Sequence, residues 1–438
     1  MFSDFGINLN FAISVFIFQL LKKICLITCE HLSYNPRLLK EADALHEAGH
    51  AVRVVAMRLQ ADKARWDEQL MARREWKLER VDACRDNLSG RWRWFKAGLR
   101  QRLYLRSPRL QRQELGLEKA YSRHFPKLAR LAAHEPADLF IAHNLPALPA
   151  AAMAARRWQA KLGFDAEDFH RGEFTPEQAK QSLLYPLTVA LEEKYVPQCQ
   201  HLTAASDGIG ATYAAALGMR QPVSILNVFP LSERAGHTPA AELQAERAGT
   251  GLSLYWYSQV IGGDRGLDDV LRAMALVGDG VHLCLRGTWA TGYEPVFWDR
   301  AKTLGVEKQI HILPLAPPEQ LVERAAQHDV GLALEPGNRP NNRFAASNKL
   351  FSYFLAGLAI VATDVPGQRG IMESVPEAGF LFRPGDSAGL AKKLREWLND
   401  PGKLLLAKQQ ARHFGETRYC WDREKDKLVN AVKQVLGR

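Results

Sequence analysis

Short apolar runs alternate with amphipathic stretches along almost the whole chain. In the first half, the runs that predict buried strands are 23–29, 52–57, 138–143, 161–168, 201–206 and 223–228. In the second half they are 252–257, 281–286, 309–313, 330–334, 359–363 and 379–382. Stretches with helical periodicity lie between them, for example 38–49, 267–277 and 318–327. This alternation predicts an α/β fold with two doubly wound, Rossmann-like domains facing each other across an interdomain cleft.

The distribution of polar residues divides the chain further. We predict an apolar extension at 1–21, a first domain at 22–230, a polar linker at 231–251, a second domain at 252–410 and a terminal helix at 411–438 that packs back on the first domain. The apolar run in the extension, 11–21, is too short to cross a bilayer and lacks the positive start of a signal peptide. An interfacial anchor and an extension ahead of the fold are equally open.

Charge and cysteine usage restrict the possible partners. The 438-residue chain carries a net charge of +10 and has a pI near 9.3, which favours an anionic partner such as nucleic acid, an acidic membrane surface or a phosphorylated substrate. Its six cysteines show neither CxxC nor zinc-site spacing. We expect reduced thiols in a cytosolic protein and no metal.

Within the first domain, residues 84–130 are rich in arginine, lysine and tryptophan, as in RWRWFK at 91–96. Three interpretations fit this composition: a solvated helical face, a helix on an anionic membrane, or a nucleic-acid patch. No recognisable nucleic-acid module accompanies the segment. Tryptophan at the interface and arginine against head groups favour the membrane.

The segment 330–367 joins two predicted strands through a polar loop and a short helix. Ser347 is suited to the N-cap of that helix and Gly357 to its end. Asn348 and Lys349 then lie in its first turn, where a positive charge opposes the helix dipole. An anionic ligand gives Lys349 a functional reason to be there.

Five motifs together resemble the GT-B glycosyltransferases of family 4 (glycosyltransferase group 1). They are SYNPRLLKEADALHEAGHAVRVV from Ser33, DLFIAHNLPALPAA from Asp138, SILNVFP from Ser224, GGDRGLDDVLRAM from Gly262 and SNKLFSYFLAGLAIVATDVPG from Ser347. They span most of the chain in the family's order. The opening βαβ pattern lacks GxGxxG, so a nicotinamide or flavin dinucleotide is not indicated.

The resemblance implies a nucleotide-sugar donor whose diphosphate is neutralised by Arg265 and Lys349 as the glycosidic bond breaks. It further assigns Asn348, Ser352, Arg286 and Gly287 to donor binding, Ser33, Asn35 and Arg37 to the acceptor side, and Glu167 and His143 to catalysis. No cofactor and no metal are implied, because the basic pair takes the role of a cation.

The chain also departs from the family pattern at four positions. Ser352 and Phe344 stand where relatives carry two glutamates, the first of which holds the donor ribose. Glu167 stands where many relatives have a histidine, and Gln259 where some have an arginine. Ser352 is a neutral group, so it would bind a ribose hydroxyl more weakly than a carboxylate.

The expected function is transfer of a sugar, with retention of configuration, to a lipid-linked or polysaccharide acceptor in cell-surface glycan biosynthesis. We expect the protein to be cytoplasmic and peripheral at the inner face of the membrane, with no nucleic-acid partner. One alternative is a non-catalytic GT-B scaffold of a polysaccharide assembly complex, which the missing carboxylates favour. Another is a GT-B sugar-nucleotide epimerase.

Overall fold

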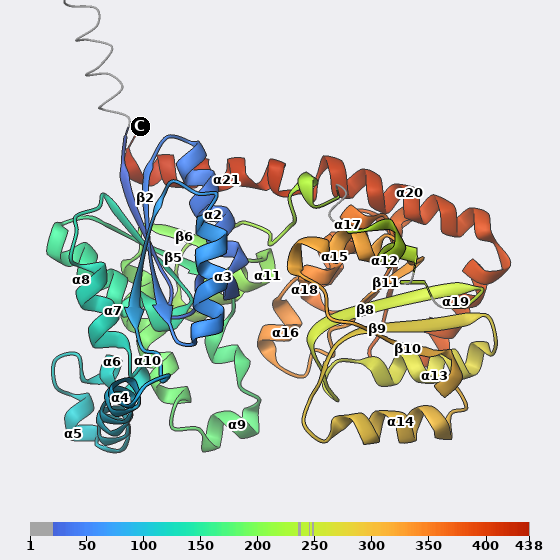
Figure 1. Ribbon diagram of the computed structural model, residues 1–438, viewed down its shortest axis with the longest axis horizontal. Coiled ribbons are helices and arrows are strands. Elements are labelled where there is room, and N and C mark those ends of the chain that lie inside the picture. Colours follow the sequence, from blue (N-terminus) through green and yellow to red (C-terminus); the bar gives the residue numbers. More distant parts are fainter. Residues whose placement is uncertain (1–20, 235–237, 245, 248, 438) are drawn as a thin grey trace, which may run out of the picture. The chain divides into compact units, whose positions relative to one another are not determined.

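The computed structural model describes residues 21–234, 238–244, 246–247 and 249–437 (Figure 1). The predicted extension at 1–21 lies outside the described residues except for Leu21. The chain forms two compact units. Unit 1 comprises residues up to 205 together with 210–225 and 425–438, and unit 2 comprises 206–209 and 226–424.

Unit 1 is built on a seven-stranded sheet in the order β3-β2-β1-β4-β5-β6-β7. The strands, all parallel, are β1 (Lys23–Ile27), β2 (Ala51–Arg58), β3 (Lys77–Asp82), β4 (Leu139–His143), β5 (Lys161–Ala166), β6 (His201–Ala204) and β7 (Val223–Ser224). The strand order reverses between β1 and β4. Ligands of such sheets bind at the carboxyl edge near this reversal.

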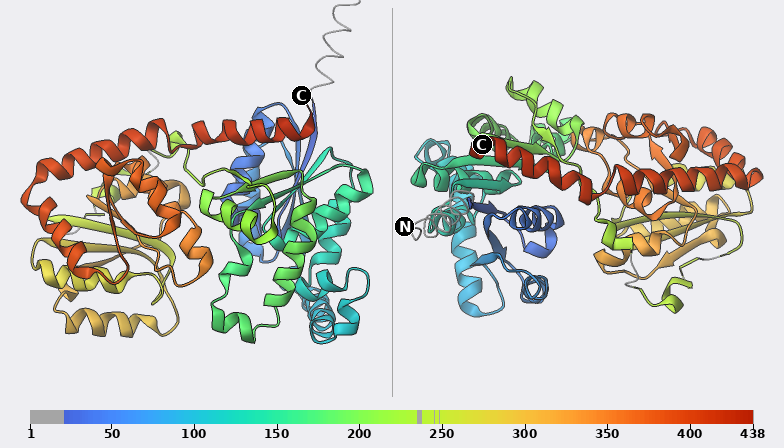
Figure 2. Two further views of the ribbon diagram at one scale, coloured as in Figure 1. Left: turned by 180° about the vertical axis from the view of Figure 1, so that it is seen from behind. Right: turned by 90° about the horizontal axis from the view of Figure 1, so that it is seen from above.

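Unit 1 contains the helices α2 (Pro36–Glu47), α3 (Ala61–Met71), α4 (Leu88–Arg106), α5 (Pro108–Gln111), α6 (Gly116–Tyr121), α7 (Phe125–Ala132), α8 (Leu148–Trp158), α9 (Pro176–Gln181), α10 (Tyr185–Tyr195) and most of α11 (Asp207–Leu217). Helices lie on both faces of its sheet (Figure 2), whereas α4, α5 and α9 lie beyond one end of it. One face of the sheet buries Leu26, Val54 and Ile141 against Leu38 and Leu45 of α2. These apolar positions recur at helical spacing on α2, which is why this helix covers the sheet.

Unit 2 has a six-stranded parallel sheet in the order β10-β9-β8-β11-β12-β13. Its strands are β8 (Leu252–Ile261), β9 (Val281–Trp289), β10 (Ile310–Leu313), β11 (Val330–Ala333), β12 (Ala359–Thr363) and β13 (Gly379–Phe382). Its helices are α12 (Ala240–Gln244), α13 (Leu267–Val277), α14 (Tyr293–Thr303), α15 (Leu321–Ala325), α16 (Pro340–Phe344), α17 (Asn348–Ala356), α18 (Pro366–Glu373), α19 (Ser387–Asn399) and α20 (Pro401–Thr417). The last helix, α21 (Trp421–Leu436), begins in unit 2 and ends in unit 1, where Val432 joins the core.

The predicted α/β class with two doubly wound sheets is confirmed, and most strands begin within one residue of the predicted position. The cleft between the domains stays a prediction. The strand β3 was missed because Lys77–Asp82 is rich in charged residues and lies at the sheet edge, where one side meets solvent. Within the predicted linker, α12 forms and Glu246 is buried.

The part of the chain that the structure describes contains no helix long and apolar enough to cross a membrane.

Candidate functional site

In unit 2 the strand order reverses between β8 and β11, and the residues singled out by the sequence gather near the carboxyl ends of these two strands. Arg265 lies in the turn between β8 and α13, and Glu335 follows β11 closely. Lys349 is the second residue of α17, the helix that connects β11 to β12. Gly331 allows α17 to lie close to β11, because a Cβ atom there would fall 2.3 Å from the ring of Tyr353. Local packing therefore positions the first turn of α17.

Lys349 is held by one carboxylate and one aromatic ring. Its Nζ lies 4.0 Å from Oε1 of Glu335 and 5.6 Å from the ring centroid of Trp256. Burial lowers the pKa of Lys349; Glu335 opposes this shift, and the nearby positive charge of Arg265 adds to it. Two cations that raise each other's electrostatic energy form a suitable site for an anion.

The first turn of α17 adds backbone donors to this site. Ser347 occupies the N-cap position, as predicted, but its side chain makes no capping hydrogen bond. Asn348 is exposed beside Lys349. Gly357 ends the helix in the left-handed conformation with φ of 74°, also as predicted. The helix start therefore combines a positive dipole end with the Lys349 side chain.

Ser352 is fully buried one turn further along α17. Tyr257 of β8 donates a hydrogen bond of 2.8 Å to Ser352 Oγ, and this hydroxyl donates in turn to the carbonyl oxygen of Lys349 at 2.9 Å. The serine thus joins β8 to α17. Its hydroxyl proton is used within the protein, which makes Ser352 a poor replacement for a ribose-binding carboxylate.

Arg286 lies inside strand β9 and is buried. Its Nε donates to the hydroxyl of Tyr255 at 2.9 Å, and its two other nitrogens contact the Pro314 carbonyl oxygen and Glu246. Its donors are engaged inside unit 2, and we assign it a structural role. The adjoining Gly287 is required by close packing, since a Cβ atom there would lie 2.5 Å from the carbonyl oxygen of Ser258.

Unit 1 brings several predicted acceptor-side residues together in a buried ionic cluster. The ring of His143, at the end of β4, lies 3.0 Å from Glu41 on α2, 3.1 Å from Glu167 and 3.4 Å from Asp165 on β5. Arg37 forms a two-point ion pair with Asp165 through Nε at 2.6 Å and Nη2 at 2.7 Å. Such buried charges are stable only when they are paired.

The pKa shifts follow from this pairing. Burial opposes the charged form of His143, but Glu41, Glu167 and Asp165 outweigh it and raise the pKa of His143 to about 10. Burial likewise opposes ionisation of Asp165, but Arg37 and His143 hold its pKa well below the usual range. We therefore describe His143 as an imidazolium and Asp165 as a carboxylate at neutral pH.

Asn35 and Glu167 lie where this cluster approaches solvent. The Asn35 amide donates to Glu167 Oε1 at 2.6 Å, while its side-chain oxygen caps α2 by accepting from the backbone N–H of Leu38. The Glu167 side chain is 20% exposed, whereas that of His143 is inaccessible. Of the two predicted catalytic residues, only Glu167 has surface with which to meet a substrate. We assign His143 a positioning role.

Ser33 lies apart from this cluster on the loop before α2. Its backbone N–H donates to Asp67 at 2.8 Å, and Asp67 also pairs with His31 at 2.9 Å. The structure connects Ser33 to α3 by these contacts.

Glu41, Asp165 and Thr203 were missed from the sequence. Thr203 Oγ1 donates to Asp165 at 2.6 Å. A signal for two of them was present: Glu41 is one helical turn from Arg37, and Asp165 interrupts an apolar strand, where a charge requires a partner. Ligand atoms of Glu41, His143 and Asp165 lie within 4.8 Å of one another, the spacing of a metal site. Arg37 and the His143 imidazolium already supply positive charge there, so we assign an ion-pair network.

The His143 cluster predicts a specific pH dependence of stability. Folding raises the pKa of His143 from 6.5 to about 10, so the charged imidazolium stabilises the folded state. This contribution is fully present below pH 6.5 and is lost as the pH rises through about 10. His143→Gln should therefore destabilise the protein most at low pH, and its free energy of unfolding should approach that of the wild type near about pH 10. Urea unfolding at about pH 6, 8 and 10 measures this. His46→Gln, which changes a half-exposed histidine, is the control, and parallel pH profiles for His143→Gln and the wild type would contradict the assignment.

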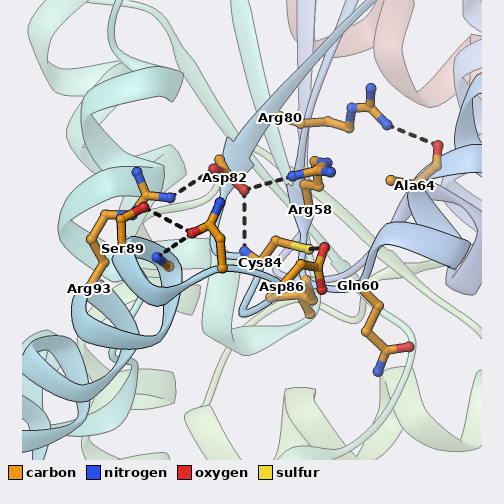
Figure 3. A network of polar contacts seen from close by, with 12 residues as sticks. Arg58, Gln60, Ala64, Arg80, Asp82, Cys84, Asp86, Ser89 and Arg93 are labelled. Carbon is orange, nitrogen blue, oxygen red and sulfur yellow. Dashed lines mark hydrogen bonds and ion pairs between the residues drawn. The ribbon is translucent and has the colours of Figure 1, made fainter.

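A second candidate surface is helix α4, which follows the edge strand β3. A polar network fastens its first turns (Figure 3): Asp82 accepts from Arg58 at 3.1 Å, from Arg93 at 3.0 Å and from the Cys84 backbone at 3.2 Å. Asn87 caps the helix by accepting from the Gly90 N–H at 2.7 Å. The start of α4 is therefore tied to the edge of the sheet.

The inner face of α4 packs on the segment around α6. Gln101 donates to the carbonyl oxygen of Tyr121 at 2.9 Å, and Arg100 to that of Arg123 at 2.9 Å. The Arg123 guanidinium also lies 4.5 Å from the ring centroid of Trp94. Because this polar face of α4 packs against the segment around α6, the large apolar residues of α4 lie on its solvent-exposed face.

The outer face of α4 is an apolar stripe with basic flanks. Its five large residues are between 49% and 83% exposed and recur at helical spacing: Leu88, Trp92, Phe95, Leu99 and Leu103. The exposed charges on the same helix are all positive: Arg91, Arg93, Lys96, Arg102 and Arg106. A continuous exposed apolar stripe of this kind marks an interaction surface.

Comparison with known proteins agrees with this architecture. Residues 254–400 match the family model described as glycosyl transferases group 1. HepE from Anabaena in complex with UDP has a similar structure, with a TM-score of 0.68, 17% identity, and coverage of 94% of this chain and 100% of HepE. No curated protein sequence matches the chain.

Two further solved structures share the fold. Sucrose-phosphate synthase from Thermosynechococcus elongatus has a TM-score of 0.69 at 13% identity, covering 94% of this chain and 99% of the synthase. WaaG, a glycosyltransferase involved in lipopolysaccharide biosynthesis, has a TM-score of 0.60 at 14% identity, and the match covers 94% of this chain and 99% of WaaG. At these identities the likeness shows the fold. Together with the family match over residues 254–400, it agrees with the resemblance seen in the sequence: the chain has the GT-B fold, and unit 2 carries a group 1 glycosyltransferase domain at residues 254–400.

Proposed function

We propose that the protein transfers a sugar from a uridine diphosphate sugar to a lipid-linked or polysaccharide acceptor. The observation that carries the proposal is the pair of cations, Arg265 and Lys349, near the strand reversal of the group 1 domain. The choice of uridine diphosphate rests on HepE, which has been crystallised with UDP and with UDP-glucose. Cell-surface glycan synthesis is favoured by the likeness to WaaG.

In this proposal the diphosphate lies against the first turn of α17. Negative charge develops on the leaving diphosphate as the glycosidic bond breaks, and Lys349, Arg265 and the backbone N–H groups at the helix start stabilise it. Asn348 is placed to donate a further hydrogen bond. These cations take the place of a metal ion. Retention of configuration is proposed from the family resemblance.

On the acceptor side, Glu167 accepts a hydrogen bond from the acceptor hydroxyl, and Asn35 orients its carboxylate. The buried His143 imidazolium pairs with Glu167 at 3.1 Å, while Glu41 and Asp165 fix the imidazolium in place. Glu167 then stands where many relatives carry a histidine.

The direct test is to screen nucleotide sugars for thermal stabilisation, since a ligand that binds the folded state raises apparent stability by mass action. We expect UDP-glucose and UDP to raise the melting temperature more than GDP-mannose or ADP-glucose does. Release of UDP from the stabilising donor should then be accelerated by a glycan or lipid-linked acceptor. A protein that binds UDP but neither hydrolyses nor transfers the sugar would instead support the scaffold alternative, and release of an epimerised donor would support an epimerase.

We further propose that α4 binds the anionic surface of a membrane, at its cytoplasmic face, as a peripheral contact. The apolar stripe provides side chains that insert at the interface, and the flanking arginines and lysine match anionic head groups. Trp92 and Phe95 stack at 5.7 Å near the start of the stripe. Tryptophan is enriched at this depth of a bilayer.

Removal of the two aromatic side chains should weaken membrane binding. Burial of a large apolar side chain contributes about 1.5–3 kcal/mol when complete, so the double variant Trp92→Ala/Phe95→Ala should lower partition onto vesicles by about 10- to 100-fold. Co-sedimentation with vesicles of phosphatidylglycerol and phosphatidylcholine measures this. Trp66→Ala, an equally exposed tryptophan outside the stripe, is the matched control. Equal binding to pure phosphatidylcholine vesicles would argue against a role for charge.

A further inference from the structure

Unit 1 contains a cavity of about 410 Å³ between α6, α7 and α8, which no step of the proposed transfer reaction uses. This volume lies within the range of small-molecule sites. Four cations line it: Lys119 from α6, Arg130 from α7, and Arg156 and Arg157 from α8. The other lining side chains are all apolar, including Phe125 and Met153.

The four cations lack partners of opposite charge. Within the described residues none of them forms an ion pair with a carboxylate. Glu118, which precedes Lys119 in the chain, is buried, and its Oε1 already accepts hydrogen bonds from Lys194 Nζ at 2.6 Å and from the Tyr195 hydroxyl at 2.5 Å. Lys119 instead lies 5.4 Å from the ring centroid of Tyr104 on α4. Four cations that line one cavity create a positive local potential, which attracts an anion.

The apolar lining restricts the type of anion. Leu115, Pro126 and Met153 are half-buried and leave apolar surface open at the cavity, while Phe125, Ala129 and Ala133 are buried behind them. A free inorganic anion would leave the exposed carbon atoms of the three half-buried residues in contact with water, whereas an apolar chain attached to the anion would cover them. One molecule with an anionic head and an apolar tail would contact both the cations and the apolar lining of the cavity.

We propose that this cavity binds the phosphate ester of an apolar chain, with the phosphate between the cations and the chain over Leu115, Pro126 and Met153. Two sources share this chemistry: an acidic phospholipid and an isoprenyl phosphate. The proposal goes beyond the transfer reaction and does not depend on it, because none of the lining residues belongs to the donor or acceptor site. It also does not require the α4 stripe.

Isothermal titration of the full chain with short, water-soluble probes tests this without a membrane. The probes are dihexanoylphosphatidic acid and geranyl phosphate, each kept below its aggregation limit, with inorganic phosphate and dihexanoylphosphatidylcholine as comparisons. We expect saturable binding of at least one phosphate ester, about tenfold or more tighter than inorganic phosphate. Preference for one ester identifies the source. Equal affinity for inorganic phosphate and both esters would overturn the proposal.

Two variants test the cavity itself. Arg130→Gln/Arg156→Gln removes two exposed charges, and Met153→Trp fills the apolar part while leaving all four cations. Each should weaken binding of the preferred ester by about tenfold or more. Arg73→Gln, an exposed arginine after α3 that lies outside both the cavity and the α4 stripe, should leave affinity unchanged. Circular dichroism confirms folding of each variant, and unchanged affinity in both cavity variants would assign the binding to another part of the protein and refute the site.

Discussion

Lys349→Ala is expected to weaken the binding of UDP by about 10- to 100-fold, because a hydrogen bond to a charged group contributes about 1.5–3 kcal/mol. Lys349 lies at the start of α17, where its Nζ is 4.0 Å from Glu335 Oε1 and 5.6 Å from the ring centroid of Trp256. Alanine removes the charge but suits a helix, so α17 should persist. The loss of transfer rate should exceed the loss of UDP affinity, since charge on the diphosphate grows in the transition state.

Isothermal titration with UDP and a coupled assay of UDP release measure the two effects separately. Lys393→Ala is the matched control, because Lys393 is exposed on α19 and pairs with Glu396 on the same helix. Lys349→Arg keeps the charge and should recover part of the affinity. An unchanged dissociation constant for UDP in Lys349→Ala would remove this residue from the donor site.

Arg37→Met is expected to destabilise unit 1 by about 3–5 kcal/mol, the usual cost of leaving one member of a buried ion pair without its partner. Methionine has a length similar to that of arginine but cannot neutralise Asp165. The carboxylate would keep only the hydrogen bond from Thr203 and the more distant contact with His143, at 3.4 Å. The carbonyl oxygen of Ile225 would also lose the Arg37 donor that reaches it at 2.5 Å.

Urea unfolding followed by circular dichroism measures this loss. Arg58→Met serves as the control in the same unit, because the Arg58–Asp82 pair is exposed and should contribute at most about 1 kcal/mol. The double variant Arg37→Met/Asp165→Leu removes both charges and should recover part of the stability. A cost below about 1 kcal/mol for Arg37→Met would show that the pair is not a structural element of unit 1.

The position of Ser352 bears on how the donor ribose is held. Its hydroxyl is bound by Tyr257 and by the Lys349 carbonyl oxygen, so the family's glutamate has been replaced by an internal contact between β8 and α17. Glu335 brings a carboxylate to this turn through its contact with Lys349. We infer that it, rather than Ser352, is the residue available to accept from a sugar hydroxyl.

The amino-acid sequence by itself determined the two parallel sheets, the first residues of most strands, and the place of Lys349 in the first turn of a helix. These features depend on local signals: apolar periodicity, Gly357 at a helix end, and Ser347 before a helix start. The family resemblance assigned Asn35 to the acceptor side and His143 and Glu167 to catalysis, and the fold brings them together because the carboxyl ends of neighbouring parallel strands share an edge.

Only the tertiary structure decided which charged groups pair and which apolar residues stay exposed. Arg286, for example, pairs with Glu246 of the predicted linker, which lies 40 positions earlier in the chain. The stripe from Leu88 to Leu103 has the spacing of a buried helical face, yet it is exposed because Gln101 and Arg100 attach the opposite face of α4. Sequence periodicity shows that a helix has two faces, but packing against distant segments decides which face is covered.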